Sequence, residues 1–339
     1  MPIHFAPSES ELQSFEKLVL HAHDLGLRYH GAATFAIPEK LRPTLQEEIL
    51  NSRVAKNVVR QDFHESDIIS GAFMMNCCKA SKADKDQWVE MWSSANPDFF
   101  FPYDKEDGDY FAAIRSGYNV LYDQHNENTQ MSSWDNKVLD PNQLDSMLSR
   151  APPMPGINQS MSYTGVKGST FGAHVEDNFL YAASVLITGA PKIWFLIQHD
   201  QSEKLHKLMR DAFPEAADEC PYYMRHKQML FSPDLLRKRS IKFSRIVQKA
   251  GTFLMLYPGV YHFRYSSGLS ISEAVNFCFP PWEEWKDKFQ TCEKHMGGRL
   301  AINIYSTEDE KKLWQEHIPL QGRSSSTGMP SMTAQSSSG

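Results

Sequence analysis

The chain has 339 residues, with 35 Lys and Arg against 41 Asp and Glu, which gives a formal net charge of −6. Hydrophobic residues make up 41% of it and aromatic residues 12%, a composition that excludes a chain disordered throughout. The slight acidic excess argues against direct sequence-specific binding of nucleic acid. No apolar run reaches the roughly 20 residues that span a bilayer, and the N-terminus lacks a signal-peptide pattern, so we expect an intracellular protein that does not enter membranes.

The number and setting of the cysteines argue against a disulfide scaffold. An odd number in a long chain favours free thiols or metal ligands. The five cysteines are Cys77, Cys78, Cys220, Cys278 and Cys292.

The first segment, residues 1–44, begins with a helical pattern. Ser8 and Glu11 have the spacing of a capping box, and apolar residues recur at helical intervals from Phe15 to Ala22. A short strand is predicted at 31–38, where Pro38 stops it. Residues 45–117 mix helical pieces with loops and contain no catalytic constellation, so we expect a mixed helical linker region there.

The next segment, residues 118–285, alternates short apolar runs with turns. The runs 181–187 and 192–197 flank the turn Gly189-Ala190-Pro191 and predict a hairpin. Two amphipathic helices, near 202–209 and 232–237, form an insertion before further strands at 251–257, 263–265 and 272–279. These parts predict a double-sheet jelly roll, and hence a mainly β fold with helical additions.

The last segments are expected to be helical and then disordered. Residues 286–320 have a helical pattern, which is clearest from Glu308 to Trp314. Residues 321–339 are rich in serine and have almost nothing to bury, which predicts a disordered tail.

Three residues in the jelly-roll segment form a candidate metal site. His174 and Glu176 are two positions apart, so on a strand their side chains point to the same side, and His262 follows the turn at Pro258-Gly259. Two histidines and one carboxylate are the ligands of non-heme Fe(II) oxygenases, which leave the opposite coordination positions open. A second His-x-Glu motif occurs at 125–127, but no strand is predicted around it. The motif at 174–176 is therefore the better candidate for metal binding.

With these residues identified, the chain resembles the jumonji histone lysine demethylases, in which a JmjN segment precedes a JmjC domain. The likeness covers about residues 3–44 and 118–295. Besides the triad, it rests on residues 156–163, 171–177, 189–194, 224–227 and 273–277. The resemblance implies a cupin-like double-stranded β-helix, a JmjN segment at 1–44, a JmjC catalytic domain at 118–285, and a nuclear enzyme that acts on chromatin.

The resemblance also implies the roles of individual residues. His174, Glu176 and His262 would hold Fe(II), and Lys192 and Tyr122 would hold the distal carboxylate of 2-oxoglutarate. A buried carboxylate does need a fixed cation, which agrees with a lysine at this place. The rest of the 2-oxoglutarate pocket would be Phe171, Ser184 and Trp194. The methylated lysine would meet Tyr163, Glu176, Ala274 and Asn276.

A second metal site is implied in the same way. Cys220 and His226 match the first half of the zinc site of the demethylases that act on lysine 9 and lysine 36 of histone H3. That family completes the site with a Cys-x-Cys pair, whereas this chain offers Cys292 and, three positions later, His295. Two cysteines and two histidines would suit tetrahedral zinc.

The predicted function is the oxidative removal of methyl groups from di- or trimethylated lysine 9 or lysine 36 in a histone H3 tail. It uses Fe(II), 2-oxoglutarate and O2, releases succinate, CO2 and formaldehyde, and is expected of a monomer. Two departures leave the substrate open: Ser184 stands where many members have asparagine, and Ala274 where one subfamily has serine. The alternatives are a lysine 4 demethylase, a protein hydroxylase with the same cofactors, and a chromatin-binding scaffold with weak or no activity.

Overall fold

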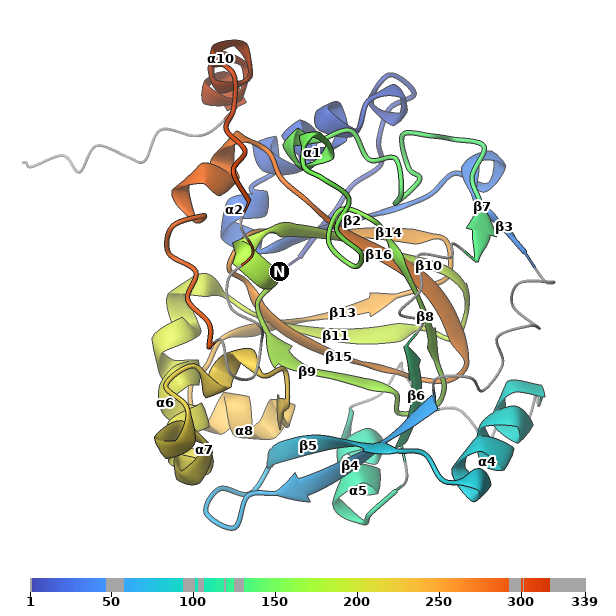
Figure 1. Cartoon of the computed structure of the whole chain (residues 1–339), viewed down its shortest axis with the longest axis vertical. Coiled ribbons are helices and arrows are strands. Elements are labelled where there is room, and N and C mark those ends of the chain that lie inside the picture. Colours follow the sequence, from blue (N-terminus) through green and yellow to red (C-terminus); the bar gives the residue numbers. More distant parts are fainter. Residues whose placement is uncertain are drawn as a thin grey trace, which may run out of the picture.

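The computed structural model describes residues 2–46, 58–93, 101–102, 107–118, 120–124, 131–292, 300 and 302–317. Two β-sheets face each other at its centre, and helices lie outside them (Figure 1). The predicted mainly β fold with a jelly-roll core and helical additions is therefore confirmed.

The larger sheet has ten strands, and every pairing in it is antiparallel except that of its first two members. In order across the sheet they are β1 (Ile3–His4), β2 (Ala32–Ala36), β14 (Thr252–Leu256), β10 (Tyr181–Gly189), β16 (Ser270–Phe277), β8 (Met161–Gly165), β6 (Val120–Gln124), β4 (Val58–Glu65), β5 (Ala72–Lys79) and β12 (Met229–Phe231). The short strand predicted at 31–38 is β2.

The smaller sheet has four antiparallel strands, in the order β13 (Phe243–Gln248), β11 (Lys192–Ile197), β15 (Tyr261–Ser266) and β9 (Thr170–His174). Two short strands, β3 (Thr44–Leu45) and β7 (Ser132–Ser133), pair with each other.

The hairpin predicted at 181–197 is wrong. β10 pairs with β14 and β16 in the larger sheet, whereas β11 pairs with β13 and β15 in the smaller sheet. The chain crosses between the sheets at Gly189, whose φ of +94° suits glycine, after a bulge between Leu186 and Thr188. Both strands are almost wholly buried, and such apolar runs look alike whether they pair with each other or with different neighbours.

The region 45–117 is not made only of helical pieces and loops. It contains β4 and β5, a pair of eight-residue strands that extends the larger sheet beyond β6. A half-buried strand is recognised in a sequence by alternating apolar and polar residues. Buried and exposed residues do not alternate in this way along β4. The expected helical pieces are α4 (Lys82–Ser93) and α5 (Gly108–Arg115).

The N-terminal helices cover the larger sheet. α1 (Phe15–Asp24) packs its apolar face on that sheet, where the Phe15 ring contacts Phe253 of β14 and Phe277 of β16, and α2 (Leu27–His30) follows it. The Ser8–Glu11 capping box forms, with Ser8 N donating to Glu11 Oε2 at 2.6 Å, but it precedes a short 3-10 turn. The N-cap of α1 itself is Ser14.

The predicted helical insertion is present at the expected positions. It contains α6 (Ser202–Ala212), α7 (Pro214–Glu219) and α8 (Pro233–Lys238). The hydroxyl of Ser232 accepts a hydrogen bond from Leu235 N at 3.3 Å, so Ser232 caps α8 as expected. These helices lie together beside one end of the roll (Figure 1).

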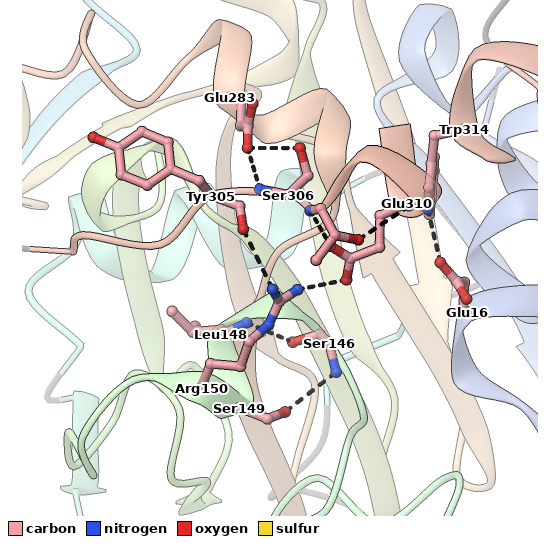
Figure 2. A network of polar contacts seen from close by, with 11 residues as sticks. Glu16, Ser146, Leu148, Ser149, Arg150, Glu283, Tyr305, Ser306, Glu310 and Trp314 are labelled. Atoms are coloured by element: carbon pink, nitrogen blue, oxygen red, sulfur yellow. Dashed lines mark hydrogen bonds and ion pairs between the residues drawn. The ribbon is translucent and has the colours of Figure 1, made fainter. Parts of the chain in front are cut away.

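The C-terminal helix α10 (Glu308–His317) is held against the N-terminal part of the chain (Figure 2). Trp314 is fully buried and donates from Nε1 to Glu16 of α1 at 2.9 Å. Arg150 bonds both the Tyr305 carbonyl oxygen and the Glu310 carboxylate. The helix predicted near 308–314 is therefore confirmed, while the tail at 321–339 lies outside the described residues.

None of the helices within the described part of the chain combines the length and apolar character needed to cross a bilayer.

Candidate functional site

His174, Glu176 and His262 come together between the two sheets. His174 is the last residue of β9, Glu176 follows in extended backbone, and His262 lies opposite His174 on the neighbouring β15. One ligand atom from each residue lies within 4.8 Å of the others. Oε1 of Glu176 is 3.2 Å from Nε2 of His262 and 4.0 Å from Nε2 of His174. The predicted grouping is therefore present: the ligand atoms of His174 and Glu176, two positions apart, lie beside that of His262.

Backbone carbonyls orient both imidazole rings. Nδ1 of His174 is 2.7 Å from the Gly172 oxygen, and Nδ1 of His262 is 3.0 Å from the Val260 oxygen. A carbonyl oxygen can only accept, so each Nδ1 donates, and each Nε2 is left to face the carboxylate. Rings that ligate metals are commonly held in this way, with the remote nitrogen donating to a backbone carbonyl.

The charge states of the cluster suit a cation. Burial alone would raise the pKa of Glu176, but its contacts with His262 and His174 outweigh burial and hold that pKa below its usual value. Burial lowers the pKa of His174, so this ring is neutral near pH 7. Nδ2 of Asn276 donates to Oε2 of Glu176 at 3.0 Å and to the Tyr181 carbonyl oxygen at 3.0 Å, which fixes the carboxylate. An ionised carboxylate beside two imidazoles fits a divalent first-row transition metal.

A cavity of about 120 Å³ opens beside the cluster and is lined from both sheets. It contains most of the residues that the resemblance placed near the keto acid and the methylated lysine. Those that line it are Tyr163, Phe171, Ser184, Trp194, Ala274 and Asn276. The structure therefore brings these predicted residues together with the three candidate ligands.

Lys192 and Tyr122 lie outside the cavity lining. Lys192, on β11, is fully buried and donates to the Ser272 hydroxyl on β16. Burial, with the charge of Arg264, lowers the pKa of Lys192 well below its usual value. The Tyr122 ring contacts Phe171 edge-on at 5.1 Å, and its buried hydroxyl has no hydrogen-bond partner among the described residues. Their predicted role toward 2-oxoglutarate stays a prediction.

Sequence reasoning missed two residues of the site. Gln248, on β13, accepts from Nε1 of Trp194 at 2.9 Å and donates to the Ser184 carbonyl oxygen at 2.9 Å, so it ties one sheet to the other. No pattern in the sequence singles it out. Arg264 lines the cavity, and its position two residues after His262 on a strand was a signal that could have identified it.

Three of the four residues predicted for a second metal site also come together. The ligand atoms of Cys220, His226 and Cys292 lie within 4.8 Å of one another, and Nε2 of His226 is 3.4 Å from Sγ of Cys292. Burial raises the pKa of the Cys220 thiol. The fourth predicted ligand, His295, lies outside the described residues.

Comparison with protein families gives a match over the same strands. A family model described as a JmjC domain, hydroxylase, matches residues 161–277, which include all three candidate ligands. The chain contains a JmjC domain. The resemblance to the jumonji family is thereby confirmed for this part of the chain, whereas the JmjN segment and the other domain boundaries stay predictions.

Curated relatives agree with this result. The chain is similar to the probable lysine-specific demethylase 4F of Homo sapiens, with 35% identity over 137 residues that make up 40% of this chain and 22% of that protein. The lysine-specific demethylase 4D of Rattus norvegicus is 34% identical over 137 residues, 40% of this chain and 27% of the relative. The lysine-specific demethylase 4B of Mus musculus is 37% identical over 152 residues, 44% of this chain and 14% of the relative. The matched part is thus less than a third of the length of each relative.

Proposed function

We propose that this chain is an Fe(II)- and 2-oxoglutarate-dependent oxygenase that removes methyl groups from methylated lysine in a histone H3 tail. The observation that carries the proposal is the cluster of His174, Glu176 and His262 in the wall of a cavity in a JmjC domain, with both rings oriented by backbone carbonyls. The names of the relatives supply the substrate class, because two are named lysine-specific demethylases and the third a probable lysine-specific demethylase.

The protein's own groups would hold the reactants. His174, Glu176 and His262 would bind one face of the metal, and Asn276 would keep the carboxylate in place through its hydrogen bond to Oε2. When bound, Fe(II) with 2-oxoglutarate supplies the oxidation of an N-methyl group by O2, with loss of formaldehyde, succinate and CO2 as the products. The buried walls of the cavity would exclude bulk water from this chemistry.

The methylated ammonium would be received by oxygen atoms and small side chains. Tyr163 lies in the cavity wall, and burial raises the pKa of its phenol to about 12, so the hydroxyl keeps its proton. Ala274 leaves room beside it, and Asn276 and Glu176 offer polar atoms. We propose a di- or trimethylated lysine 9 or lysine 36 as the substrate, and a nuclear site of action, since histone tails are located there.

The cluster of Cys220, His226 and Cys292 would hold a structural zinc ion, with His295 as the fourth ligand. The bound ion would connect the turn after α7, which carries Cys220 and His226, to the segment after the jelly roll, which carries Cys292. Two thiolates and one imidazole suit zinc, and a closed tetrahedral site stabilises the fold without taking part in the reaction.

The test is mass spectrometry of mono-, di- and trimethylated H3 peptides after incubation with the protein, Fe(II), ascorbate and 2-oxoglutarate. The panel covers lysines 4, 9 and 36, and the matched variants are His174→Ala, in the cluster, and His64→Ala, at an exposed histidine of β4. We expect one peptide to lose the mass of one or more methyl groups with the wild type and His64→Ala, but not with His174→Ala.

Each of the other possible outcomes would support a different function or specificity. Loss of methyl groups only from the lysine 4 peptides would replace the proposed site specificity. A stable gain of one oxygen atom would indicate a protein hydroxylase. No change in any peptide, together with no conversion of 2-oxoglutarate to succinate, would refute the enzyme and favour a chromatin-binding scaffold.

A further inference from the structure

Arg264 is a buried cation that lines the candidate site. It lies two residues after His262 on β15, so the two side chains point to the same side of the strand. The side chain is in the cavity wall, and Arg264 is only 7% exposed. A guanidinium at this depth has lost most of its water and needs other groups to compensate.

Aromatic rings surround the guanidinium. Its central carbon is 4.1 Å from the centroid of the Phe171 ring, 5.1 Å from that of Trp194 and 5.9 Å from that of Tyr163. Among the residues that the structure describes, none forms a hydrogen bond or an ion pair with Arg264. Ring faces stabilise a cation but leave the N–H donors of arginine unused. The donors are therefore free for an anion that enters the cavity.

The register of β15 and β11 places Arg264 between the metal ligands and Lys192. His262 lies opposite Leu196, Arg264 opposite Trp194, and Lys192 opposite Ser266, two residue pairs further from His262 than Arg264. Because Arg264 lines the cavity and Lys192 does not, a ligand that starts at the metal and extends inward meets the guanidinium first.

We propose that Arg264 binds the distal carboxylate of the keto acid cosubstrate and selects for a dicarboxylic acid. This inference rests on the proposed function, since it assumes that a keto acid occupies the metal side of the cavity. The planar guanidinium can give two parallel N–H···O bonds to one carboxylate, which an ammonium group cannot do. Lys192 then lies behind it as a second positive or donor group, bonded to Ser272.

The experiment measures binding of two keto acids to the full chain, by calorimetry with Mn(II) in place of Fe(II) to prevent turnover. The ligands are 2-oxoglutarate and 2-oxopentanoate, a keto acid of the same chain length that ends in a methyl group. The variants are Arg264→Gln, Arg264→Lys and Lys192→Gln. Arg237→Gln is the control, because Arg237 also stacks on a ring, that of Phe243, but is an exposed residue outside the cavity lining.

We expect the wild type and Arg237→Gln to prefer 2-oxoglutarate. In Arg264→Gln this preference should fall by about tenfold or more, because 2-oxoglutarate binding weakens while 2-oxopentanoate binding does not. Arg264→Lys should keep part of the preference, since it restores the charge but not the paired donors. The ratio of the affinities for the two keto acids does not change when part of the protein is unfolded. Thermal melting of each variant, followed by circular dichroism, measures any loss of folding directly.

The remaining outcomes distinguish a failure of the role proposed for Arg264 from a failure of the proposed oxygenase function. If Arg264→Gln keeps the wild-type preference while Lys192→Gln loses it, the role given to Arg264 is overturned and the oxygenase proposal stands. Equal weakening of both keto acids in Arg264→Gln would also overturn it, because the guanidinium would then act on a part that both acids share. If the metal-loaded wild type binds neither keto acid, the proposed function itself fails, and the inference fails with it.

Discussion

The fold contains a buried histidine that should make stability depend on pH below neutrality. His23, on α1, is 3% exposed, and its Nε2 lies 3.0 Å from the Tyr181 hydroxyl. Its ring also packs edge-on against Trp314 of α10, at 5.1 Å between ring centroids. Burial, with the nearby charges of Arg28 and His317, lowers the pKa of His23 from 6.5 to about 3. The folded protein therefore keeps this ring neutral where an unfolded chain would protonate it.

The size of the effect follows from the two pKa values. Between pH 6.5 and pH 3 the unfolded state binds a proton at His23 that the folded state does not bind, so acid favours unfolding. The contribution of His23 is complete above its unfolded pKa and is lost progressively as the pH falls toward the folded value. Between about pH 7.5 and about pH 5, a single site of this kind lowers the free energy of unfolding by about 2 kcal/mol.

The assay is urea unfolding at both pH values for the wild type, His23→Gln and His64→Gln. Glutamine retains a polar group but cannot titrate, and His64 is an exposed histidine that controls for the removal of a histidine as such. We expect His23→Gln to be less stable at the higher pH, but to lose about 2 kcal/mol less than the other two proteins on acidification. An equal loss in all three proteins would refute the assignment of a neutral buried imidazole at His23.

Three further predictions concern the site. Asn276→Ala removes the hydrogen bond to Glu176 and should weaken metal binding roughly 10- to 100-fold, which titration of the metal-free protein with Mn(II) would measure; unchanged affinity would contradict the orienting role. Gly172→Ala places a Cβ 2.2 Å from the Lys227 carbonyl oxygen and should cost about 1–3 kcal/mol in urea unfolding, whereas Gly108→Ala, with no atom within 4 Å, should cost far less. A chelator should abolish demethylation of the H3 peptide, and added Fe(II) should restore it; activity that persists without metal would refute the role of the cluster.

The candidate ligands could be predicted because they follow a strand rule. His174 and Glu176 are two positions apart in extended backbone, and His262 lies on the strand that pairs with β9. The i and i+2 spacing is a property of the local chain, so it is visible without knowledge of the fold. The same rule would have found Arg264, since it is two positions beyond His262. It was missed because a lone arginine in a strand is usually solvated, and the sequence does not report its burial.

Long-range pairing could not be predicted in the same way. The runs that became β10 and β11 were correctly identified as strands, yet they belong to different sheets, because both are buried on both faces and carry no alternation that would assign partners. β4 was missed altogether, since polar residues such as Arg60 and Asp62 interrupt it. The interactions that bring Gln248 to Trp194 and Ser184 likewise depend on tertiary packing alone.

The place of β2 in the larger sheet has a consequence for how the protein is made. β2 pairs on one side with β14, with Thr34 opposite Leu254, so roughly 220 residues of synthesis separate the two strands. At common translation rates this interval is on the order of 10 to 45 s. During it, the two-residue β1 is the only sheet partner, among the strands that the structure describes, that has been made for the apolar strand Ala32–Ala36. His262 is synthesised only shortly after β14, so the sheet and the metal cluster become possible almost at the same moment. A nascent chain stalled before residue 252 should therefore be bound by chaperones, whereas one that has released residues 252–277 from the ribosome should begin to retain metal.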